Sequence, residues 1–182
     1  MRKVIMALGI SLDGYIARQD GTFDFLYMPK DYFEGDFAAF LASIDVAVMG
    51  RKTYDVSQAM GGDSFGGKIA SYVFSRTLPS GEHDGATFVK STPRAFIGRL
   101  RRQKGKNIWL MGGGELGRDF LKADLVDELH IGVVPTLLGQ GIPLFPPGFP
   151  QREFALVENQ TFSKGLIAIK YKRMRGKSKK KN

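Results

Sequence analysis

Apolar runs rich in β-branched residues alternate with segments of helical pattern along most of the chain. The apolar runs predict strands over residues 3–10, 45–49, 69–74, 86–90, 107–111 and 127–134. The helical pattern covers residues 36–43, 51–58, 93–102 and 115–122. Two further runs, 154–161 and 166–174, predict a terminal hairpin. Strands that alternate with helices and end in a hairpin predict an α/β fold, with a mainly parallel central sheet flanked by helices and an antiparallel edge.

The segments between these elements are rich in residues that favour turns. Residues 11–25 contain two Asp-Gly pairs and predict a loop, residues 61–67 (GGDSFGG) predict a flexible segment, and residues 139–150 predict a Gly/Pro loop. No internal repeat is visible. A chain of 182 residues with 43% hydrophobic and 25% charged content fits one globular domain.

Composition excludes several kinds of chemistry. The sequence has no cysteine, so it has no disulfide framework, thiolate metal site or thiol nucleophile. Its two histidines, His83 and His130, lie far apart in the chain and do not suggest a metal site. Residues 1–10 read as a first strand rather than a signal peptide, and no apolar run approaches the roughly 18 residues that span a bilayer. We therefore expect a cytoplasmic protein.

The net charge of +9 is concentrated at the C-terminus. Eight basic residues and no acidic ones follow position 169: Lys170, Lys172, Arg173, Arg175, Lys177, Lys179, Lys180 and Lys181. The rest of the chain therefore carries only +1. Blocks of like charge are usually solvated and disordered. We expect a folded domain over residues 1–175 and a disordered basic tail over residues 176–182, with a weak contact to nucleic acid or an acidic surface as the alternative.

A glycine-rich turn follows the strand at 107–111. Residues Gly112 to Gly117 satisfy G-x-G-x-x-G, the dinucleotide fingerprint. A Rossmann unit would place it after a first strand, with an acidic residue at the end of the second, but the next strand here ends in VVPTLL. Gly117 falls inside the predicted helix, where it allows close packing. Two interpretations stay open for this turn alone: an anion-binding helix N-terminus, or a sharp turn without a ligand.

Two other strand ends carry residues suited to phosphate. The sequence VAVMGRKTYD is again strand, glycine and helix start, with Arg51 and Lys52 adjacent and Thr53 able to cap. The strand in YVFSRTL ends at Ser75 and Arg76. Arginine binds phosphate with a planar pair of donors, which suits a ribose 2′-phosphate. Each feature alone could be an exposed charge or a turn, but the three in order favour a dinucleotide phosphate site.

Taken together, the ordered motifs resemble a known family. SLDGYIA, DVAVMGRKTYD, YVFSRTL, MGGGELGRDFL and LVDELHIGVVPTLLGQGIPLF resemble the C-terminal reductase domain of the bacterial riboflavin-biosynthesis protein and the stand-alone dihydrofolate-reductase-like proteins grouped with it. The similarity covers nearly the whole chain and is weakest in the final hairpin. It implies a dihydrofolate reductase-like fold, NADPH as cofactor, a small-molecule substrate and a homodimer.

The resemblance also implies a set of cofactor-binding residues. One helix start would hold the pyrophosphate and the 2′-phosphate through Gly50, Arg51, Lys52 and Thr53. The other would hold the pyrophosphate through Gly112, Gly113, Gly114, Glu115 and Leu116. Ser75 and Arg76 would flank the ribose phosphate. Gly9 and Ile16 would offer backbone groups to the nicotinamide carboxamide. The family further implies a cis peptide at Gly112–Gly113. We expect Glu115 to point away from the phosphates, as an acid in the first turn of a helix.

Two aspartates are candidates for the catalytic site. Dihydrofolate reductase has one carboxylate at the start of the helix that precedes the MGRxT strand, and Asp36 lies close to that position. The alternative for Asp36 is a helix N-cap. Asp13 lies in the loop that would border the nicotinamide, and its alternative is a turn residue in SLDG.

The SLDG motif favours the riboflavin branch, so we expect a reductase of the 5-amino-6-(5-phosphoribosylamino)uracil type. Two other functions stay open: a dihydrofolate reductase, and a non-enzymatic binder that uses the basic C-terminal tail. The riboflavin domain works beside a zinc deaminase, for which this sequence has no Cys/His ligand set. We therefore expect no metal, and the lack of a spanning apolar run predicts no membrane partner.

Overall fold

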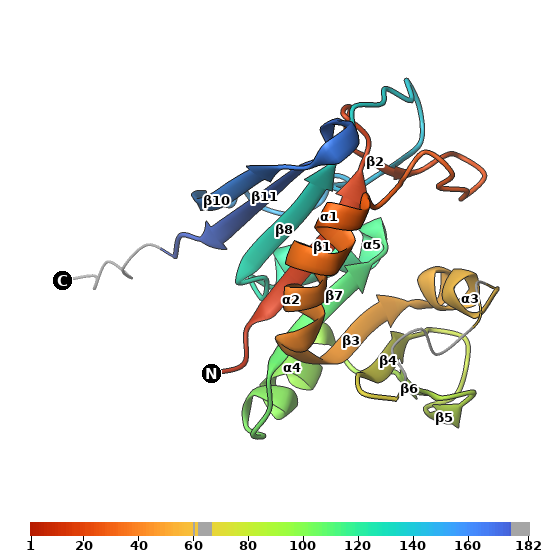
Figure 1. The fold of residues 1–182 in the computed structure, drawn as a ribbon. Coiled ribbons are helices and arrows are strands. Elements are labelled where there is room, and N and C mark those ends of the chain that lie inside the picture. The colour runs from red at the N-terminus through yellow and green to blue at the C-terminus, as the bar shows by residue number, and fades with distance from the viewer. Residues whose placement is uncertain (60, 62–66, 176–182) are drawn as a thin grey trace.

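A nine-stranded sheet forms the centre of the computed structural model, which describes residues 1–59, 61 and 67–175 (Figure 1). Its strands are β1 (Val4–Ile10), β3 (Ile44–Gly50), β4 (Ala70–Phe74), β5 (Gly81–His83), β6 (Ala86–Val89), β7 (Asn107–Gly112), β8 (Glu128–Val133), β10 (Phe154–Thr161) and β11 (Ile167–Arg173). Their order across the sheet is β10-β11-β8-β1-β7-β3-β4-β6-β5. The inner strands from β8 to β6 are parallel, whereas β5, β10 and β11 run antiparallel to their neighbours. The predicted fold class, with its antiparallel C-terminal edge, is confirmed.

Helices cover both faces of the sheet (Figure 1). The helices are α1 (Lys30–Tyr32), the π-helix η1 (Phe33–Phe37), α2 (Ala38–Ala42), α3 (Arg51–Ala59), α4 (Pro93–Arg101), α5 (Gly114–Lys122) and the 3-10 turn η2 (Ser163–Gly165). Alternate residues of β1 point to opposite faces: Met6 joins the core beneath α4 and α5, and Ile5 joins the core beneath α2 and α3. Burial on both faces explains why the central strands read as continuous apolar runs rather than alternating ones.

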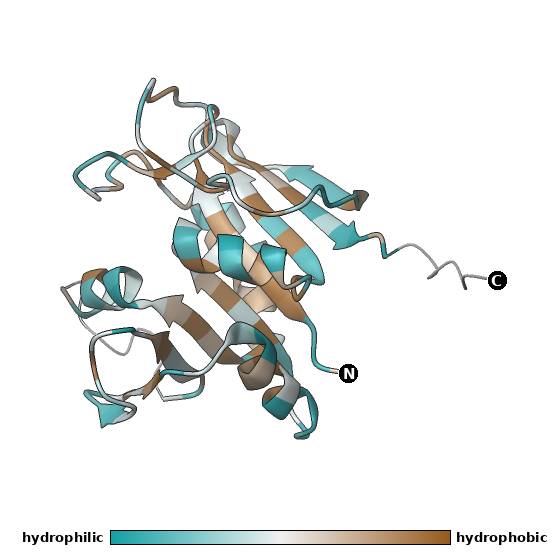
Figure 2. Ribbon diagram, turned by 180° about the vertical axis from the view of Figure 1, so that it is seen from behind, coloured by the Kyte–Doolittle hydropathy of each residue, from teal (hydrophilic) through white to brown (hydrophobic). Residues whose placement is uncertain are grey.

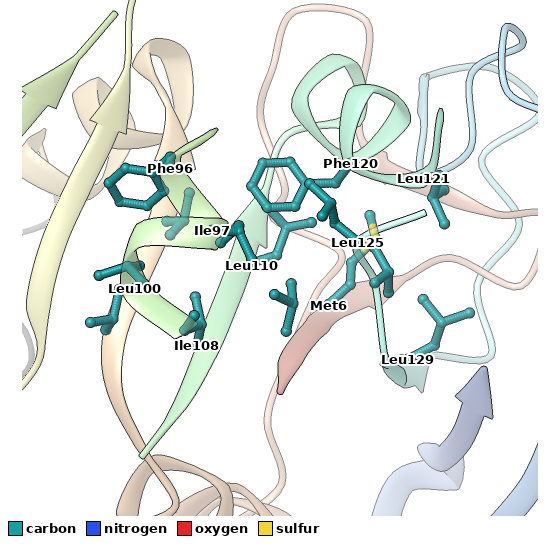
Figure 3. Packing of buried hydrophobic residues seen from close by; sticks show 14 of the residues in the cluster. Met6, Phe96, Ile97, Leu100, Ile108, Leu110, Phe120, Leu121, Leu125 and Leu129 are labelled. Atoms are coloured by element: carbon teal, nitrogen blue, oxygen red, sulfur yellow. The ribbon is translucent and has the colours of Figure 1, made fainter. Parts of the chain in front are cut away.

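The larger core lies between the sheet and the helix pair α4 and α5. Figure 3 shows Phe96 and Ile97 of α4 beside Phe120 of α5, above Met6 and Leu110 of the sheet. A Cβ placed on Gly117 would lie 2.6 Å from the Met6 Cε atom, so α5 packs directly on β1 as its glycine predicted. Figure 2 shows the corresponding hydropathy: hydrophobic residues concentrate in the strands, and hydrophilic ones lie on the outer turns of the helices.

The helix before β3 starts earlier than predicted. It begins at Lys30, directly after Pro29, and Asp36 lies within η1 rather than at an N-cap. The apolar spacing that predicted residues 36–43 describes only its second half. Aromatic packing holds the first half: the ring of Tyr32 contacts that of Phe162 edge-on, with centroids 5.1 Å apart. Tertiary packing therefore stabilises a helix that includes Gly35, a residue of low helix propensity.

Three short strands lie in segments predicted as loops or left unassigned. Besides β5, these are β2 (Tyr15–Ala17) and β9 (Ile142–Pro143), which pair with each other in a separate two-stranded sheet. Each has only two or three residues, too few to show a periodic pattern. Most of the predicted flexible segment 61–67 and the whole basic tail 176–182 lie outside the described residues.

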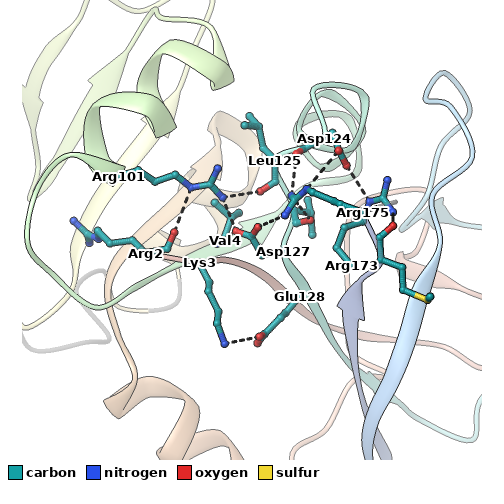
Figure 4. A network of polar contacts seen from close by, with 12 residues as sticks. Arg2, Lys3, Val4, Arg101, Asp124, Leu125, Asp127, Glu128, Arg173 and Arg175 are labelled. Carbon is teal, nitrogen blue, oxygen red and sulfur yellow. Dashed lines mark hydrogen bonds and ion pairs between the residues drawn. The ribbon is translucent and has the colours of Figure 1, made fainter. Parts of the chain in front are cut away.

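An ion-pair network fixes the end of the C-terminal hairpin (Figure 4). Asp127, 9% exposed, accepts hydrogen bonds from the Val4 backbone nitrogen at 2.8 Å, from Arg175 at 2.7 Å and from Arg101. Arg173 reaches Asp124 at 2.9 Å. Two of the clustered C-terminal arginines thus belong to the folded domain and are neutralised there. Among the described residues, no helix is long and apolar enough to cross a membrane.

Candidate functional site

The predicted cofactor residues gather at the carboxyl ends of the parallel strands. Because β1, β7, β3 and β4 are consecutive neighbours in the sheet and run in the same direction, the segments that follow them lie at one edge (Figure 1). Ligands of open α/β sheets bind at this edge. The structure therefore brings together residues from four segments that are far apart in sequence.

Two strand-to-helix junctions meet directly at this edge. Met49 of β3 is the register partner of Gly112 in β7. A Cβ placed on Gly50 would lie 3.8 Å from the Gly113 nitrogen, and one on Gly113 would lie 3.6 Å from the Thr53 hydroxyl oxygen. The N-termini of α3 and α5 thus start side by side. The first N–H groups of each helix lack intrahelical partners and carry a partial positive charge, so the pair forms a place suited to an anion.

The glycine turn is shaped by close backbone contacts. Gly112 has a φ of +129°, and the peptide between Gly112 and Gly113 is cis, as the family resemblance implied. A Cβ on Gly114 would lie only 2.7 Å from the Pro143 carbonyl oxygen, so a larger residue does not fit there. The N-cap residue of α5 is Gly113, and no side chain caps this helix. Its free N–H groups are therefore left for another acceptor.

Basic side chains border the two junctions. Arg51 lies at the start of α3, with its guanidinium 5.8 Å from the centre of the Phe88 ring and 2.5 Å from the Asp55 carboxylate. Arg76 follows β4 and reaches to 3.6 Å from Glu115 in the first turn of α5. That ion pair contributes little energy because both side chains are exposed, at 95% and 74%. The Glu115 side chain is exposed, and Arg76 flanks the same opening as the glycine turn. Lys52 is exposed beside Arg51.

Ser75 has a local structural role. Its side chain is buried, and its hydroxyl oxygen accepts hydrogen bonds from the backbone nitrogens of Thr77 at 3.3 Å and Leu78 at 3.0 Å. These bonds fix the turn that presents Arg76.

Gly9 and Ile16 lie on the other side of the glycine turn. Gly9 is near the end of β1, and Ile16 belongs to β2, whose partner β9 contains Pro143. Because the Pro143 carbonyl contacts Gly114, this small sheet is connected directly to the start of α5. Leu26 covers Gly9, with a side-chain carbon 3.2 Å from the position of a Cβ on that glycine.

Asp13 joins two loops at the same edge. Its carboxylate accepts hydrogen bonds from the Ser11 hydroxyl at 2.6 Å and from the backbone nitrogens of Leu138 and Gly139 at 3.1 and 2.7 Å. The Ser11 hydroxyl, with help from these two amides, holds the pKa of Asp13 below its usual range against the opposing effect of desolvation. The Asp13 carboxylate therefore stays ionised and holds the loop after β8 against the loop after β1.

Asp36 lies farther along the helix and is paired. Its side chain, 16% exposed, forms an ion pair with the ammonium of Lys170 in β11, which also lies 3.1 Å from Glu158 in β10. Sequence reasoning placed Asp36 near the substrate but missed Lys170, because that lysine was counted with the basic C-terminal residues. It also missed Tyr32, whose hydroxyl lies 4.0 Å from the position of a Cβ on Gly132. The signal for Tyr32 was its place one helical turn before Asp36.

The two histidines pack against aromatic rings in different parts of the fold, His83 against Phe88 and His130 against Phe40. The His130 ring lies 3.3 Å from Glu128 and packs against Phe40 within the fold. Within the described part of the chain, no cluster of three or more His, Asp or Glu side chains could hold a metal ion.

The sequence is similar to those of known proteins. Residues 2–168 match the model of the RibD C-terminal domain. Two proteins of Bacillus subtilis (strain 168) are similar: uncharacterized protein YwjB, 39% identical over 148 residues (79% of this chain and 83% of that protein), and uncharacterized protein YyaP, 32% identical over 181 residues (93% and 94%).

Solved structures agree with this match. A protein of Shewanella sp. PV-4 assigned to riboflavin biosynthesis superposes with a TM-score of 0.82 at 31% identity, over 96% of this chain and all of that one. The deaminase/5-amino-6-(5-phosphoribosylamino)uracil reductase of Thermotoga maritima shares the fold, with a TM-score of 0.72 at 13% identity, over 95% of this chain and 57% of that one. The motifs, the sheet order and these similarities agree, and the chain belongs to the RibD C-terminal domain family.

Proposed function

We propose that this protein is an NADPH-dependent reductase that delivers hydride to a small heterocycle of the riboflavin-pathway aminopyrimidine type. One observation carries the proposal: the helix starts after Gly50 and Gly113 lie side by side at the edge where ligands of such sheets bind. A single pyrophosphate could be reached by N–H groups from both helices. Membership of the RibD C-terminal domain family supports a reductase.

The residues at the edge fit the chemical groups of NADPH. The uncapped N-terminus of α5, beside the start of α3, suits the pyrophosphate, and the absence of a side chain on Gly114 lets the Pro143 carbonyl pack against that helix start. Arg51 and Arg76 supply the charges for a 2′-phosphate, which NADH lacks. On binding, each arginine would exchange its carboxylate neighbour, Asp55 or Glu115, for the phosphate.

The bound nicotinamide would supply the hydride, and the chain would position and protect it. Gly9 and Ile16 would present backbone groups to the carboxamide from β1 and β2. Asp13 would hold the two bordering loops together and so keep water from the reacting atoms. Asp36 would lie beside the substrate, paired there with Lys170.

We expect the protein to work in the cytoplasm and, as the family resemblance implies, as a homodimer. Exposed apolar side chains support a self-association surface: Leu156 and Val157 of the edge strand β10 are 54% and 63% exposed, and Leu137 is 70% exposed. Light scattering would test this state directly.

Fluorescence titration with NADPH and with NADH tests the proposed function. We expect saturable binding of NADPH and much weaker binding of NADH. Equal affinities, or no binding of either nucleotide, would contradict it. Rapid oxidation of NADPH on addition of dihydrofolate would instead support a folate reductase.

A further inference from the structure

Two glycines lie side by side next to the cofactor edge. Gly9 of β1 and Gly132 of β8 are register partners in neighbouring parallel strands. A Cβ on Gly132 would lie 4.0 Å from both the Gly9 Cα and the Tyr32 hydroxyl oxygen. The Tyr32 hydroxyl is therefore placed over these two strand ends, on the sheet face that carries α1, η1 and α2 (Figure 1).

The Tyr32 ring is held in place while its hydroxyl stays unpaired. The ring packs against Phe162 at 5.1 Å and Phe37 at 6.1 Å between centroids. Among the described residues, the Tyr32 hydroxyl has no hydrogen-bond partner. No unpartnered side-chain nitrogen or oxygen in that part of the chain is fully buried, so solvent reaches this hydroxyl. A fixed and accessible hydroxyl can therefore bond to a ligand. Burial, and then the charge of Asp36, raise the pKa of Tyr32 to about 12, so it is a hydrogen-bond donor at neutral pH.

The ion pair with Lys170 limits the negative charge that Asp36 presents to a ligand. The Lys170 ammonium forms an ion pair with Asp36 from the far end of the chain, and Asp36 is 16% exposed. A charge pair in a poorly hydrated position is costly to separate, because removing one partner leaves the other desolvated. The second carboxylate on Lys170, that of Glu158, is 50% exposed and therefore screened by solvent. A cationic, amino-rich ring would have to compete with Lys170 for Asp36.

We propose that Tyr32 contacts the substrate as a hydrogen-bond donor, and that Lys170 is a positioning residue that neutralises Asp36, so that the site selects rings with carbonyl acceptors. This inference rests on the proposed function, because it places the substrate beside the nicotinamide. Such a site would distinguish two classes of ring. A pyrimidinedione has carbonyls that accept a hydrogen bond, whereas a protonated diaminopyrimidine binds best to a free carboxylate.

Binding of two probe rings to the protein saturated with NADPH tests this inference. The probes are 5,6-diaminouracil and 2,4-diaminopyrimidine, and the variants are Tyr32→Phe and Lys170→Met. Tyr171→Phe and Lys172→Met are matched controls, because Tyr171 packs against the core beneath α4 and α5 and Lys172 is exposed opposite Glu128. NADPH affinity and thermal stability are measured for every variant, so that a folding defect is recognised.

We expect 5,6-diaminouracil to bind more tightly than 2,4-diaminopyrimidine. Tyr32→Phe should weaken the uracil probe by roughly tenfold, the effect of one lost hydrogen bond. Lys170→Met should shift the preference toward the diaminopyrimidine, which a merely structural role would not do. NADPH affinity should stay unchanged in all variants.

Three results would overturn the inference while leaving the proposed function intact. They are retention of wild-type uracil affinity by Tyr32→Phe, an unchanged preference in Lys170→Met, or failure of the uracil probe to bind the NADPH complex. Failure of the wild-type protein to bind NADPH would instead overturn the proposed function itself.

Discussion

Gly50 and Gly113 face each other across the neighbouring strands β3 and β7, with 3.8 Å between the position of a Cβ on Gly50 and the Gly113 nitrogen. Neither glycine has a side chain to separate the two helix starts, so α3 and α5 present their N-termini to the same space. One helix N-terminus attracts an anion weakly. Two adjacent N-termini with Arg51 and Arg76 beside them match a dinucleotide with an additional phosphate.

The close approach at Gly114 predicts a sensitive position. Gly114→Ala would place a Cβ 2.7 Å from the Pro143 carbonyl oxygen, which is backbone and cannot move easily. We expect a loss of about 1–3 kcal/mol in the free energy of unfolding, as for overpacked sites, together with weaker NADPH binding. Gly98→Ala in α4 is the control, since only the Arg102 side chain lies near, at 4.0 Å. Urea denaturation should show this control unchanged or stabilised, and a stable Gly114→Ala that binds NADPH normally would refute the importance of this close packing at the start of α5.

The two arginines predict the choice of nucleotide. Arg51→Ala and Arg76→Ala should each weaken NADPH by about 10- to 100-fold, the range for a lost charge-assisted bond, and leave NADH affinity nearly unchanged. Arg99→Ala, an exposed arginine on α4, removes the same charge elsewhere and should preserve the preference. Isothermal titration of both nucleotides measures the effect. An equal fall in the affinities for NADPH and NADH would mean that these arginines do not bind the 2′-phosphate.

The buried Asp127 predicts a stability effect away from the site. Asp127→Asn would leave Arg101 and Arg175 without their shared carboxylate, as Figure 4 shows. We expect a loss of about 3 kcal/mol in the free energy of unfolding, as when one partner of a buried ion pair is removed. Asp119→Asn is the control, because its carboxylate is 51% exposed and pairs with the adjacent Arg118. Guanidinium denaturation that finds both variants equal would show that the network contributes little.

Glu128 predicts an acid-sensitive component of stability. Its hydrogen bond with the His130 ring, together with that from the Lys3 ammonium, outweighs desolvation and lowers its pKa from 4.5 to about 2. A lowered folded-state pKa means that the ionised form favours the folded state, so this stabilisation is complete above the unfolded value of 4.5 and is lost as pH falls toward 2.

Comparison with Glu128→Gln isolates that component. The difference in unfolding free energy between the wild type and the variant should be largest near neutral pH and shrink between about pH 4.5 and 2. Glu153→Gln, at an exposed residue, should show no such trend. A difference that stays constant with pH would contradict the assignment to Glu128.

Most of the fold could be predicted because its strands are buried on both faces. Runs such as residues 108–111 are apolar throughout, and Gly50 and Gly112 mark the ends of two of the strands. The helix that contains Tyr32 and Asp36 was only half predicted, since its first half depends on contacts with Phe162, far away in the chain. Strands β2 and β9 were missed because their pairing is determined by tertiary contacts with the glycine turn.

The cofactor edge was easier to predict than the substrate side. Parallel strands bring their carboxyl ends together, so motifs after β3, β4 and β7 had to meet once the fold was right. The pairing of Asp36 with Lys170 depends on where the terminal hairpin joins the sheet, beside β8, and no local pattern indicates it. The roles of Asp13 and Asp36 in catalysis stay predictions.

A crystal structure of the protein with NADPH tests the central claim most directly. The pyrophosphate should lie between the N-termini of α3 and α5, within hydrogen-bonding distance of backbone nitrogens from both the Gly50 and the Gly113 junctions. A pyrophosphate that contacts only one junction, or a nucleotide bound elsewhere on the molecule, would contradict the account.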